Sequence, residues 1–231
     1  MAKKGKNYRA ALAAIEPGKA YAPVEGFTIL KETNKLNFDP TVELVFHLGI
    51  DPRKADQMVR GAVSLPHGIG KTVRVAVIAG GSKAAEALEA GADVAGGAEL
   101  LEDIEALIDS VDSIIATPDM MGQLGRHGKV LGPRGLMPNP KAGTVTMDVT
   151  KAVTEIKAGR IEYRSDRNGN VHTVMGKASF TVEQLTGNFR AMVEELTRQR
   201  PSAAKGRYMQ SVTVSTSASP GIKMDPSVKE L

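Results

Sequence analysis

The residues best suited to chemistry lie between positions 126 and 145, where glycine, proline and positive charge are concentrated. This stretch contains no acidic residue and four cationic ones: Arg126, Lys129, Arg134 and Lys141. Its glycines and prolines exclude a continuous helix or a central strand. A rigid basic loop with exposed amides can bind a polyanion such as a phosphate backbone. The alternative is a connector whose charges only keep it hydrated.

The other candidate chemical motifs are incomplete. Residues 68–72 end like a phosphate-binding P-loop, but Leu65 stands where that motif requires glycine, and the strong predicted strand follows the run instead of preceding it. Gly80-Gly81 after that strand lacks the dinucleotide-binding spacing. The four histidines are scattered, cysteine is absent, and no nucleophile elbow or carboxylate pair stands out. The sequence therefore predicts no catalysis, no metal and no cofactor.

Charge is distributed unevenly along the 231 residues. The net charge is +4 overall, but residues 1–70 carry +3, residues 160–231 carry +4, and residues 71–159 carry −3. A polyanion is therefore expected to meet the two ends of the chain and the basic loop, and to avoid the acidic middle. The hydrophobic content of 42% suffices for an aliphatic core, and no apolar run is long enough for a membrane span or a signal peptide. These features predict a soluble, cytosolic protein.

The middle third is predicted to form an α/β unit. Residues 73–79 and 112–116 are almost continuously apolar, which is typical of strands covered on both faces. Helices are expected at 82–90, where Gly91 provides a stop, and at 98–108. Alternation of strand and helix predicts a parallel sheet with right-handed crossovers.

The two ends of the chain carry patterns of half-exposed strands. Strands are predicted at 42–48, 161–167, 170–175 and 208–216. Asn168-Gly169 is a two-residue hairpin signal between two of them. Thr181 and Gln184 form a capping box before an apolar helical stripe over 182–196. Two further segments, a short helix and a second element of unspecified docking, are expected at 9–14 and 28–36.

Neither end offers enough elements for a core by itself, and both are basic. We therefore predict two domains: a discontinuous α+β domain with an antiparallel sheet, built from residues 1–70 and 157–231, and an inserted Rossmann-like α/β domain over 71–156. The connections between them contain Gly68, Gly70 and Gly159, which predicts a hinge.

Residues 120–145 resemble the signature of the ribosomal protein L1 family, the large-subunit proteins of the mobile stalk beside the tRNA exit site. The likeness is centred on Leu131-Gly132-Pro133-Arg134-Gly135-Leu136-Met137-Pro138 and extends along nearly the whole chain. Other matching segments are 38–43, 48–53, 60–68, 116–122 and 156–163. The resemblance is to the bacterial type and implies the same two-domain layout.

The resemblance also implies a function. Such a protein is a structural constituent of the cytoplasmic ribosome, not an enzyme, and it binds large-subunit ribosomal RNA directly. It helps deacylated tRNA to leave the exit site, where the basic loop would approach the tRNA. It represses its own operon by binding the messenger RNA.

The alternative is a nucleotide-dependent enzyme, because an α/β domain beside a second domain is a common enzyme layout. Retention of ATP or NAD by the purified protein would favour that alternative.

The family's RNA contacts, carried over by motif, fall in the domain built from the two ends. They are Phe38, Thr41, Glu43, Asp166, Arg167, His172, Ser215, Thr216, Ser217, Ala218, Ser219, Pro220 and Gly221, and the strand hydroxyls of Ser211 and Thr213 join them. An aromatic ring can pack on a base or sugar, and hydroxyls can bond 2′-OH and phosphate groups. The alternatives are a core position for Phe38 and an ordinary solvated strand face for the hydroxyls.

The sequence departs from the family pattern at one place in this set. Ser217-Ala218-Ser219 stands where the family usually carries Thr-Met-Gly. Ala218 lacks the reach of methionine, and Ser219 lacks the backbone freedom of glycine. The resemblance therefore implies where the binding loop lies, but it does not imply which contacts these three residues make with RNA.

Overall fold

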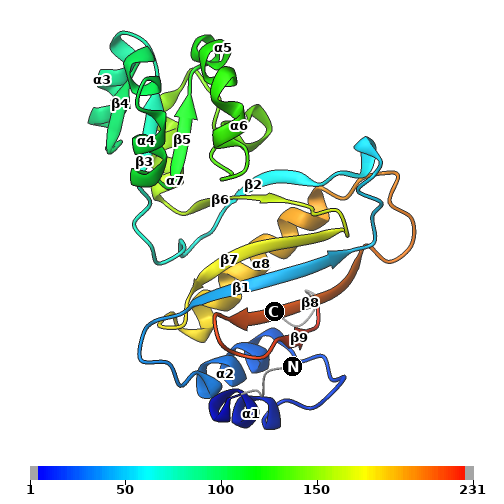
Figure 1. Cartoon of the computed structure of the whole chain (residues 1–231). Coiled ribbons are helices and arrows are strands. Elements are labelled where there is room, and N and C mark those ends of the chain that lie inside the picture. Colours follow the sequence, from blue (N-terminus) through cyan, green and yellow to red (C-terminus); the bar gives the residue numbers. More distant parts are fainter. Residues whose placement is uncertain (1–4, 227–231) are drawn as a thin grey trace. The chain divides into compact units, whose positions relative to one another are not determined.

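A computed structural model describes residues 5–226, and the chain divides into two compact units (Figure 1). Unit 1 combines residues 1–71 and 161–231, and unit 2 comprises residues 72–160. The second boundary follows Arg160 instead of residue 156, because helix α7 (Val149–Lys157) packs its apolar side on the sheet of unit 2. Residues 1–4, with two of the N-terminal lysines, lie outside the described residues.

Unit 1 contains a four-stranded antiparallel sheet. Its strand order is β7 (Asn170–Lys177), β1 (Thr41–Leu48), β8 (Met209–Thr216) and β9 (Ile222–Met224). The strands lie side by side in Figure 1. Every second side chain of β1 is buried, as the apolar alternation of its sequence predicts. Two shorter strands, β2 (Arg60–Ser64) and β6 (Arg160–Arg164), pair in a separate sheet.

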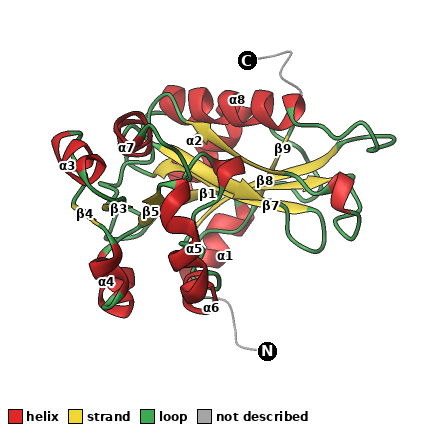
Figure 2. Cartoon of the chain, turned by 90° about the horizontal axis from the view of Figure 1, so that it is seen from above, coloured by secondary structure: helices red, strands yellow, loops and turns green. Residues whose placement is uncertain are grey.

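Helices cover one face of the antiparallel sheet. These are α2 (Pro23–Thr33) and α8 (Val182–Arg198), with α1 (Lys6–Ala13) preceding them in the chain. Figure 2 shows α2 and α8 on the same side of the strands. The ring of Phe189 on α8 stacks on Phe46 of β1 at 6.3 Å between centroids and meets Phe27 of α2 edge-on at 6.2 Å. Thr181 and Gln184 form the predicted capping box of α8.

The predicted hairpin at Asn168-Gly169 is confirmed only next to the turn, where Ser165 and Val171 form one antiparallel bridge and the Asp166 N–H donates to the Asn170 carbonyl at 2.7 Å. Beyond that bridge, the predicted pairing of the two strands with each other is wrong. β6 pairs with β2 and β7 pairs with β1, so the chain changes sheets at this turn. A two-residue type I′ turn requires positive φ at both central residues, but only Gly169 has it, at +81°. The Asp166 carboxylate instead accepts the N–H groups of Asn168 and Asn170 and closes a longer turn.

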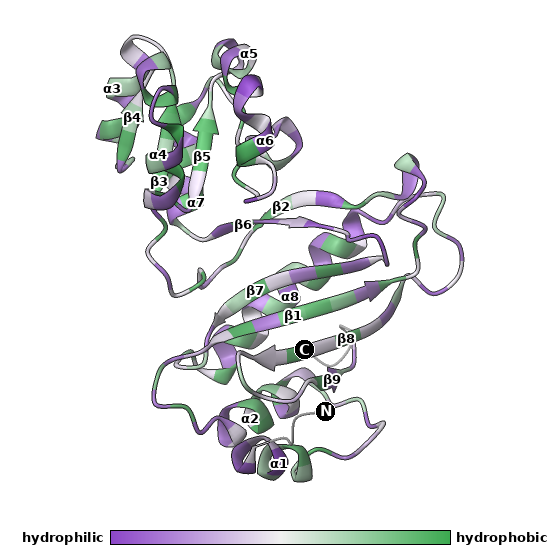
Figure 3. Cartoon of the chain, in the orientation of Figure 1, coloured by the Kyte–Doolittle hydropathy of each residue, from purple (hydrophilic) through white to green (hydrophobic). Residues whose placement is uncertain are grey.

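Unit 2 contains a three-stranded parallel sheet with helices on both faces. The strand order is β4 (Val94–Gly96), β3 (Val75–Ile78) and β5 (Ser113–Ala116), and the helices include α3 (Ser82–Glu89) and α4 (Ile104–Ser110). Side chains of β3 enter two apolar clusters, one on each side of the sheet. Figure 3 shows the resulting contrast between the apolar strands of unit 2 and the alternating strands of unit 1. The mixed fold class is confirmed.

Two local predictions for unit 2 need correction. Strand β4 was not predicted, because three residues are too short to show a periodic pattern. The helix expected at 98–108 is divided into a 3-10 turn, η2 (Ala98–Leu101), and α4, since Asp103 leaves helical geometry at φ −108° and ψ 41°. The Glu99 carboxylate accepts the N–H of Gly97 at 2.7 Å and caps the turn.

Candidate nucleic-acid interface

Within unit 1, the sheet face opposite α2 and α8 carries six of the predicted binding residues, namely Thr41, Glu43, His172, Ser211, Thr213 and Ser215. We call this surface the open strip and define it as Thr41, Glu43, Val45, His47, His172, Val174, Ser211, Thr213 and Ser215. The strand register sets them in rows across the sheet, with Val45 between His172 and Thr213, and Glu43 between Val174 and Ser215. These side chains are half-buried or exposed. Three segments that are far apart in the sequence thus form one surface.

Sequence reasoning missed two residues of the strip that can make polar or apolar contacts. His47 lies beside Ser211, and its Nδ1 is 2.8 Å from the side-chain oxygen of Asn170. Val45 occupies the centre of the strip. The signal was present, because both residues share the odd-numbered face of β1 with Thr41 and Glu43.

The polar groups of the open strip are largely available. The hydroxyl groups of Ser211, Thr213 and Ser215 form no hydrogen bond with residues 5–226, and the Glu43 carboxylate forms no ion pair there. At one end of the strip, Lys177 Nζ donates to Thr41 Oγ1 at 2.9 Å. Hydroxyl groups that both donate and accept are suited to ribose 2′-OH and phosphate oxygens.

Phe38 is exposed, so a core position for it is wrong. Its side chain is 59% exposed immediately before β1. The neighbouring Asp39 fixes this segment, since its two carboxylate oxygens accept the N–H and the hydroxyl of Ser179 at 2.9 and 2.7 Å. An apolar ring thus stands in solvent on a fixed backbone, which suits packing against a base or sugar.

The turn at 166–169 uses Asp166 internally. Partial burial raises the pKa of Asp166, but hydrogen bonds from the backbone and side chain of Asn170, from the Asn168 N–H and from His172 outweigh it and hold that pKa below its ordinary value. His172 Nε2 lies 3.6 Å from the carboxylate. Asp166 is therefore ionised and orders the turn, while Arg167 beside it is exposed.

Two residues of the predicted binding loop at 215–221 are buried. Thr216 lies opposite Val42 on the core side of the sheet and is 6% exposed, and Pro220 is also buried. The prediction that these two side chains contact a ligand directly is therefore wrong. Thr216 points into the core because neighbouring side chains of a strand point to opposite faces. The exposed members are Ser217, Ala218 and Gly221.

Ser219 closes this loop. Its hydroxyl oxygen accepts the N–H of Thr216 at 2.8 Å, and its own N–H donates to the Thr216 carbonyl at 3.2 Å. The serine that replaces the family's glycine thus has a structural role, and the exposed tip consists of Ser217 and Ala218.

The basic stretch of unit 2 is partly helical. The turns α5 (Met121–Leu124), η4 (Gly125–His127) and α6 (Gly128–Leu131) follow one another, so the loop expected from residue 126 begins after Leu131. Glycine tolerates helical angles at a cost below that of proline, and the first proline comes only at position 133. The side chains of Leu124 and Leu131 are fully buried and anchor these turns.

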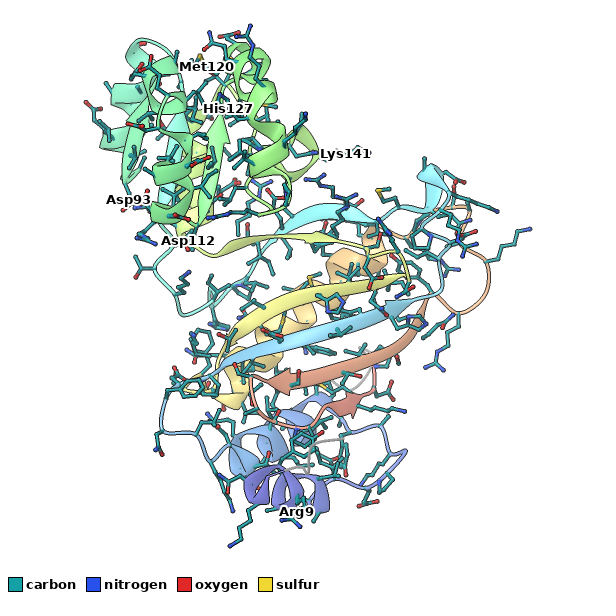
Figure 4. All side chains as sticks on the ribbon, viewed as in Figure 1. Arg9, Asp93, Asp112, Met120, His127 and Lys141 are labelled. Carbon is teal, nitrogen blue, oxygen red and sulfur yellow. The ribbon has the colours of Figure 1, made fainter. Side chains whose placement is uncertain are left out.

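Among the residues that the structure describes, three of the four cations of this stretch form no ion pair. Arg134 forms an ion pair with Asp109 of α4, which is distant in sequence. Arg126, Lys129 and Lys141 are exposed and form no ion pair with the described part of the chain. Figure 4 shows Lys141 at the periphery of unit 2, away from Asp93 and Asp112, which precede β4 and β5. Exposed, unpaired cations can meet a polyanion.

The first connection between the units contains two glycines that are packed against unit 1. Gly68 and Gly70 have positive φ, at +63° and +68°, and Gly159 has +104°. The Gly68 carbonyl accepts the side-chain amide of Asn188 at 2.9 Å, and a Cβ at Gly70 would lie 2.8 Å from Phe180. Both glycines therefore belong to the packing of unit 1, and hinge motion about them stays a prediction.

Residues 5–226 contain no cluster of three or more His, Asp or Glu side chains arranged to hold a metal ion. In the same range, no helix is long and apolar enough to cross a membrane.

Comparisons with known proteins agree on one family. The model of the Ribosomal protein L1p/L10e family matches residues 30–220. A large ribosomal subunit protein uL1 of Paenarthrobacter aurescens is 57% identical over 231 residues, which cover 100% of this chain and 98% of the relative. The uL1 proteins of Renibacterium salmoninarum and Streptomyces virginiae are 54% and 56% identical, over 100% and 96% of this chain and 98% and 93% of those proteins.

Proposed function

The chain belongs to the ribosomal protein L1p/L10e family, and we propose that it binds large-subunit ribosomal RNA directly through the open strip of unit 1. Its relatives are named large ribosomal subunit proteins, so it is a structural constituent of that subunit and not an enzyme, and we place it in the cytoplasm with the ribosome. The observation that carries the RNA proposal is the convergence of hydroxyl, carboxylate and imidazole groups from β1, β7 and β8 on one sheet face without helices.

The chemistry of the strip favours folded RNA. The hydroxyls of Ser211, Thr213 and Ser215, which form no hydrogen bond within the described part of the chain, match the 2′-OH groups and phosphates that line the shallow minor groove of RNA. The Glu43 carboxylate is an acceptor for base amino groups or 2′-OH groups. Phe38 offers a stacking surface at one end, and Arg167 a cation at the other. In this proposal, Thr216 and Pro220 shape the binding loop from beneath, and Asp166 orders the turn that presents Arg167.

Two further roles follow from the family. We propose that unit 2 approaches exit-site tRNA through Arg126, Lys129 and Lys141 and assists its release. In this proposal Arg134 does not contact the tRNA, because it pairs with Asp109. We also propose that the protein represses its own operon, since a messenger segment with the shape of the ribosomal site would present the same 2′-OH and phosphate groups to the open strip. Movement of unit 2 during tRNA release would use the connections near Lys71 and Gly159.

A salt titration tests RNA binding. We expect affinity for the stalk segment of large-subunit ribosomal RNA to fall roughly 20- to 150-fold between about 50 and 200 mM salt, as for the release of counterions from about three or four phosphates. Binding is measured by filter retention or anisotropy, with a DNA of the same sequence as the control. The DNA should bind more weakly, because it lacks the 2′-OH groups. A flat salt response, or equal affinity for the DNA, would contradict the proposal.

The exposed tip at Ser217 and Ala218 provides a second test. We expect the double variant S217T/A218M to bind the RNA fragment several-fold more tightly, because a methionine side chain adds an apolar contact that Ala218 cannot reach. Ser219 is kept, since its hydroxyl closes the loop. The control is the triple variant S217T/A218M/S219G, which should have a lower free energy of unfolding because it lacks the hydroxyl that closes the loop. If the double variant binds RNA as the wild type does, the tip does not touch the RNA.

A further inference from the structure

A second feature of unit 1 lies at the end of β1 that is remote from Phe38. There, a depression of about 530 Å³ opens beside the end of the strand. Its lining includes His47, Gly49, Asn168, Lys205, Arg207 and Gln210. We call it the β1-end pocket. His47 belongs to both this pocket and the open strip, so the two surfaces are continuous.

The backbone around the pocket is fixed by close contacts. The N–H of Gly49 donates to the Tyr208 carbonyl at 2.6 Å, and a Cβ at Gly49 would lie only 2.4 Å from the carbonyl oxygen of Arg207. The preceding loop is tied by Arg200, whose Nη2 donates to the carbonyls of Ala204 and Gly206 at 3.1 Å each. Lys205 and Arg207 are therefore presented from an ordered backbone.

The charges of the pocket are available to a ligand. Lys205 and Arg207 are exposed, and neither forms an ion pair with residues 5–226. Arg207 Nε donates to the Met209 carbonyl at 3.0 Å, and the two outer nitrogens of its guanidinium form no hydrogen bond with residues 5–226. The acid that lines the pocket, Asp51, accepts the N–H of Arg53 at 3.2 Å. A guanidinium and an ammonium beside the amides of Asn168 and Gln210 suit a phosphate group.

We propose that the β1-end pocket binds a phosphate group of the RNA that lies on the open strip, with Lys205 and Arg207 as its cationic contacts. The inference rests on the proposed function and extends its footprint beyond the residues carried over from the family. The eight residues of β1 span about 26 Å at about 3.3 Å per residue. RNA that contacts Phe38 at one end of β1 would thus also be bound at the other end of β1, where the pocket contacts one of its phosphates.

The salt dependence of binding tests this proposal. We expect K205Q and R207Q each to weaken binding of the stalk RNA fragment about five- to tenfold and to reduce the slope of log K against log salt by about one. The matched control is R190Q, which removes an exposed arginine from α8 on the helix-covered side and should leave the slope unchanged. Wild-type slopes in both pocket variants would overturn the proposal. Failure of the wild type to bind the RNA would instead overturn the proposed function.

Cross-linking locates the contact independently. The chain has no cysteine, so Q210C carries a photoactivatable thiol reagent at one defined place. We expect this variant to cross-link to the RNA fragment, whereas E194C, on the exposed side of α8, should not. Equal yields from the two variants would overturn the proposal. Binding of inorganic phosphate that R207Q abolishes, without a cross-link to RNA, would assign the pocket to a free anion and overturn it as well.

Discussion

Replacing Asn188 with leucine is expected to lower the free energy of unfolding of unit 1 by about 3–5 kcal/mol. Asn188 is 0% exposed and makes three hydrogen bonds. Its Oδ1 accepts the His67 N–H at 3.1 Å, and its Nδ2 donates to the carbonyls of Gly68 and Met175 at 2.9 and 2.8 Å. Leucine leaves the buried Met175 carbonyl unsatisfied, which costs about 1–3 kcal/mol, and removes two part-buried hydrogen bonds at residues 67 and 68 that contribute about 1 kcal/mol each.

Tyrosine fluorescence in a urea titration measures this effect selectively. The chain has no tryptophan and four tyrosines, and all four lie in the segments that form unit 1. The signal therefore follows unit 1 and not unit 2. The control is N37L, because Asn37 is exposed and forms no side-chain hydrogen bond with the described chain. A midpoint for N188L equal to that of N37L would show that the network at residues 67–68 contributes nothing to stability.

The position of Asn188 also bears on function. It ties helix α8 and strand β7 to the segment through which the chain leaves unit 1. The exit point is thereby set by the core of unit 1, and movement of unit 2 would begin beyond Gly70. Of the glycines predicted as a hinge, Gly68 and Gly70 are thus packed within unit 1.

Replacing Phe38 with alanine is expected to weaken binding of the stalk RNA about 5- to 150-fold, which corresponds to the roughly 1–3 kcal/mol of a base–aromatic stack. The side chain is 59% exposed, so the substitution should change the free energy of unfolding by less than about 0.5 kcal/mol. Titrations at fixed salt measure the affinity, and urea denaturation checks the stability.

V24A is the matched control for this substitution. Val24 on α2 is 52% exposed and lies away from the open strip, so its truncation should alter neither affinity nor stability. Wild-type affinity in F38A would remove Phe38 from the interface. Earlier unfolding together with an unchanged affinity of the folded protein would mean that Phe38 supports the fold and does not contact RNA.

Signals confined to one element were predictable from the sequence. The alternation in 41–48 identifies the buried face of β1, because neighbouring side chains of a strand point to opposite faces. The capping box at Thr181 marks the start of α8, since its hydrogen bonds join residues three positions apart. The apolar runs of β3 and β5 required helices on both faces, which predicted the parallel sheet of unit 2.

Contacts between residues that are distant in the sequence could not be predicted from it. Asn168-Gly169 predicts a turn, but it does not determine which strands the flanking residues join, and here β1 is the partner of β7. The sequence predicted that Arg134 would be available to a polyanion, whereas in the structure it forms an ion pair with Asp109. An ion pair or a strand pairing of this kind depends on tertiary packing and leaves no local pattern.

The sequence by itself determined the residue types of the candidate interface, which side chains of each strand share a face, and the family to which the motifs point. Only the tertiary structure decided that β7, β1 and β8 lie next to one another, and thus that His172, Val45 and Thr213 form one row. It alone turned Thr216 inward, exposed Phe38, and placed Lys205 and Arg207 beside His47. The physical reason is that side-chain alternation is a property of one strand, whereas neighbours across a sheet are chosen by the burial of the whole core.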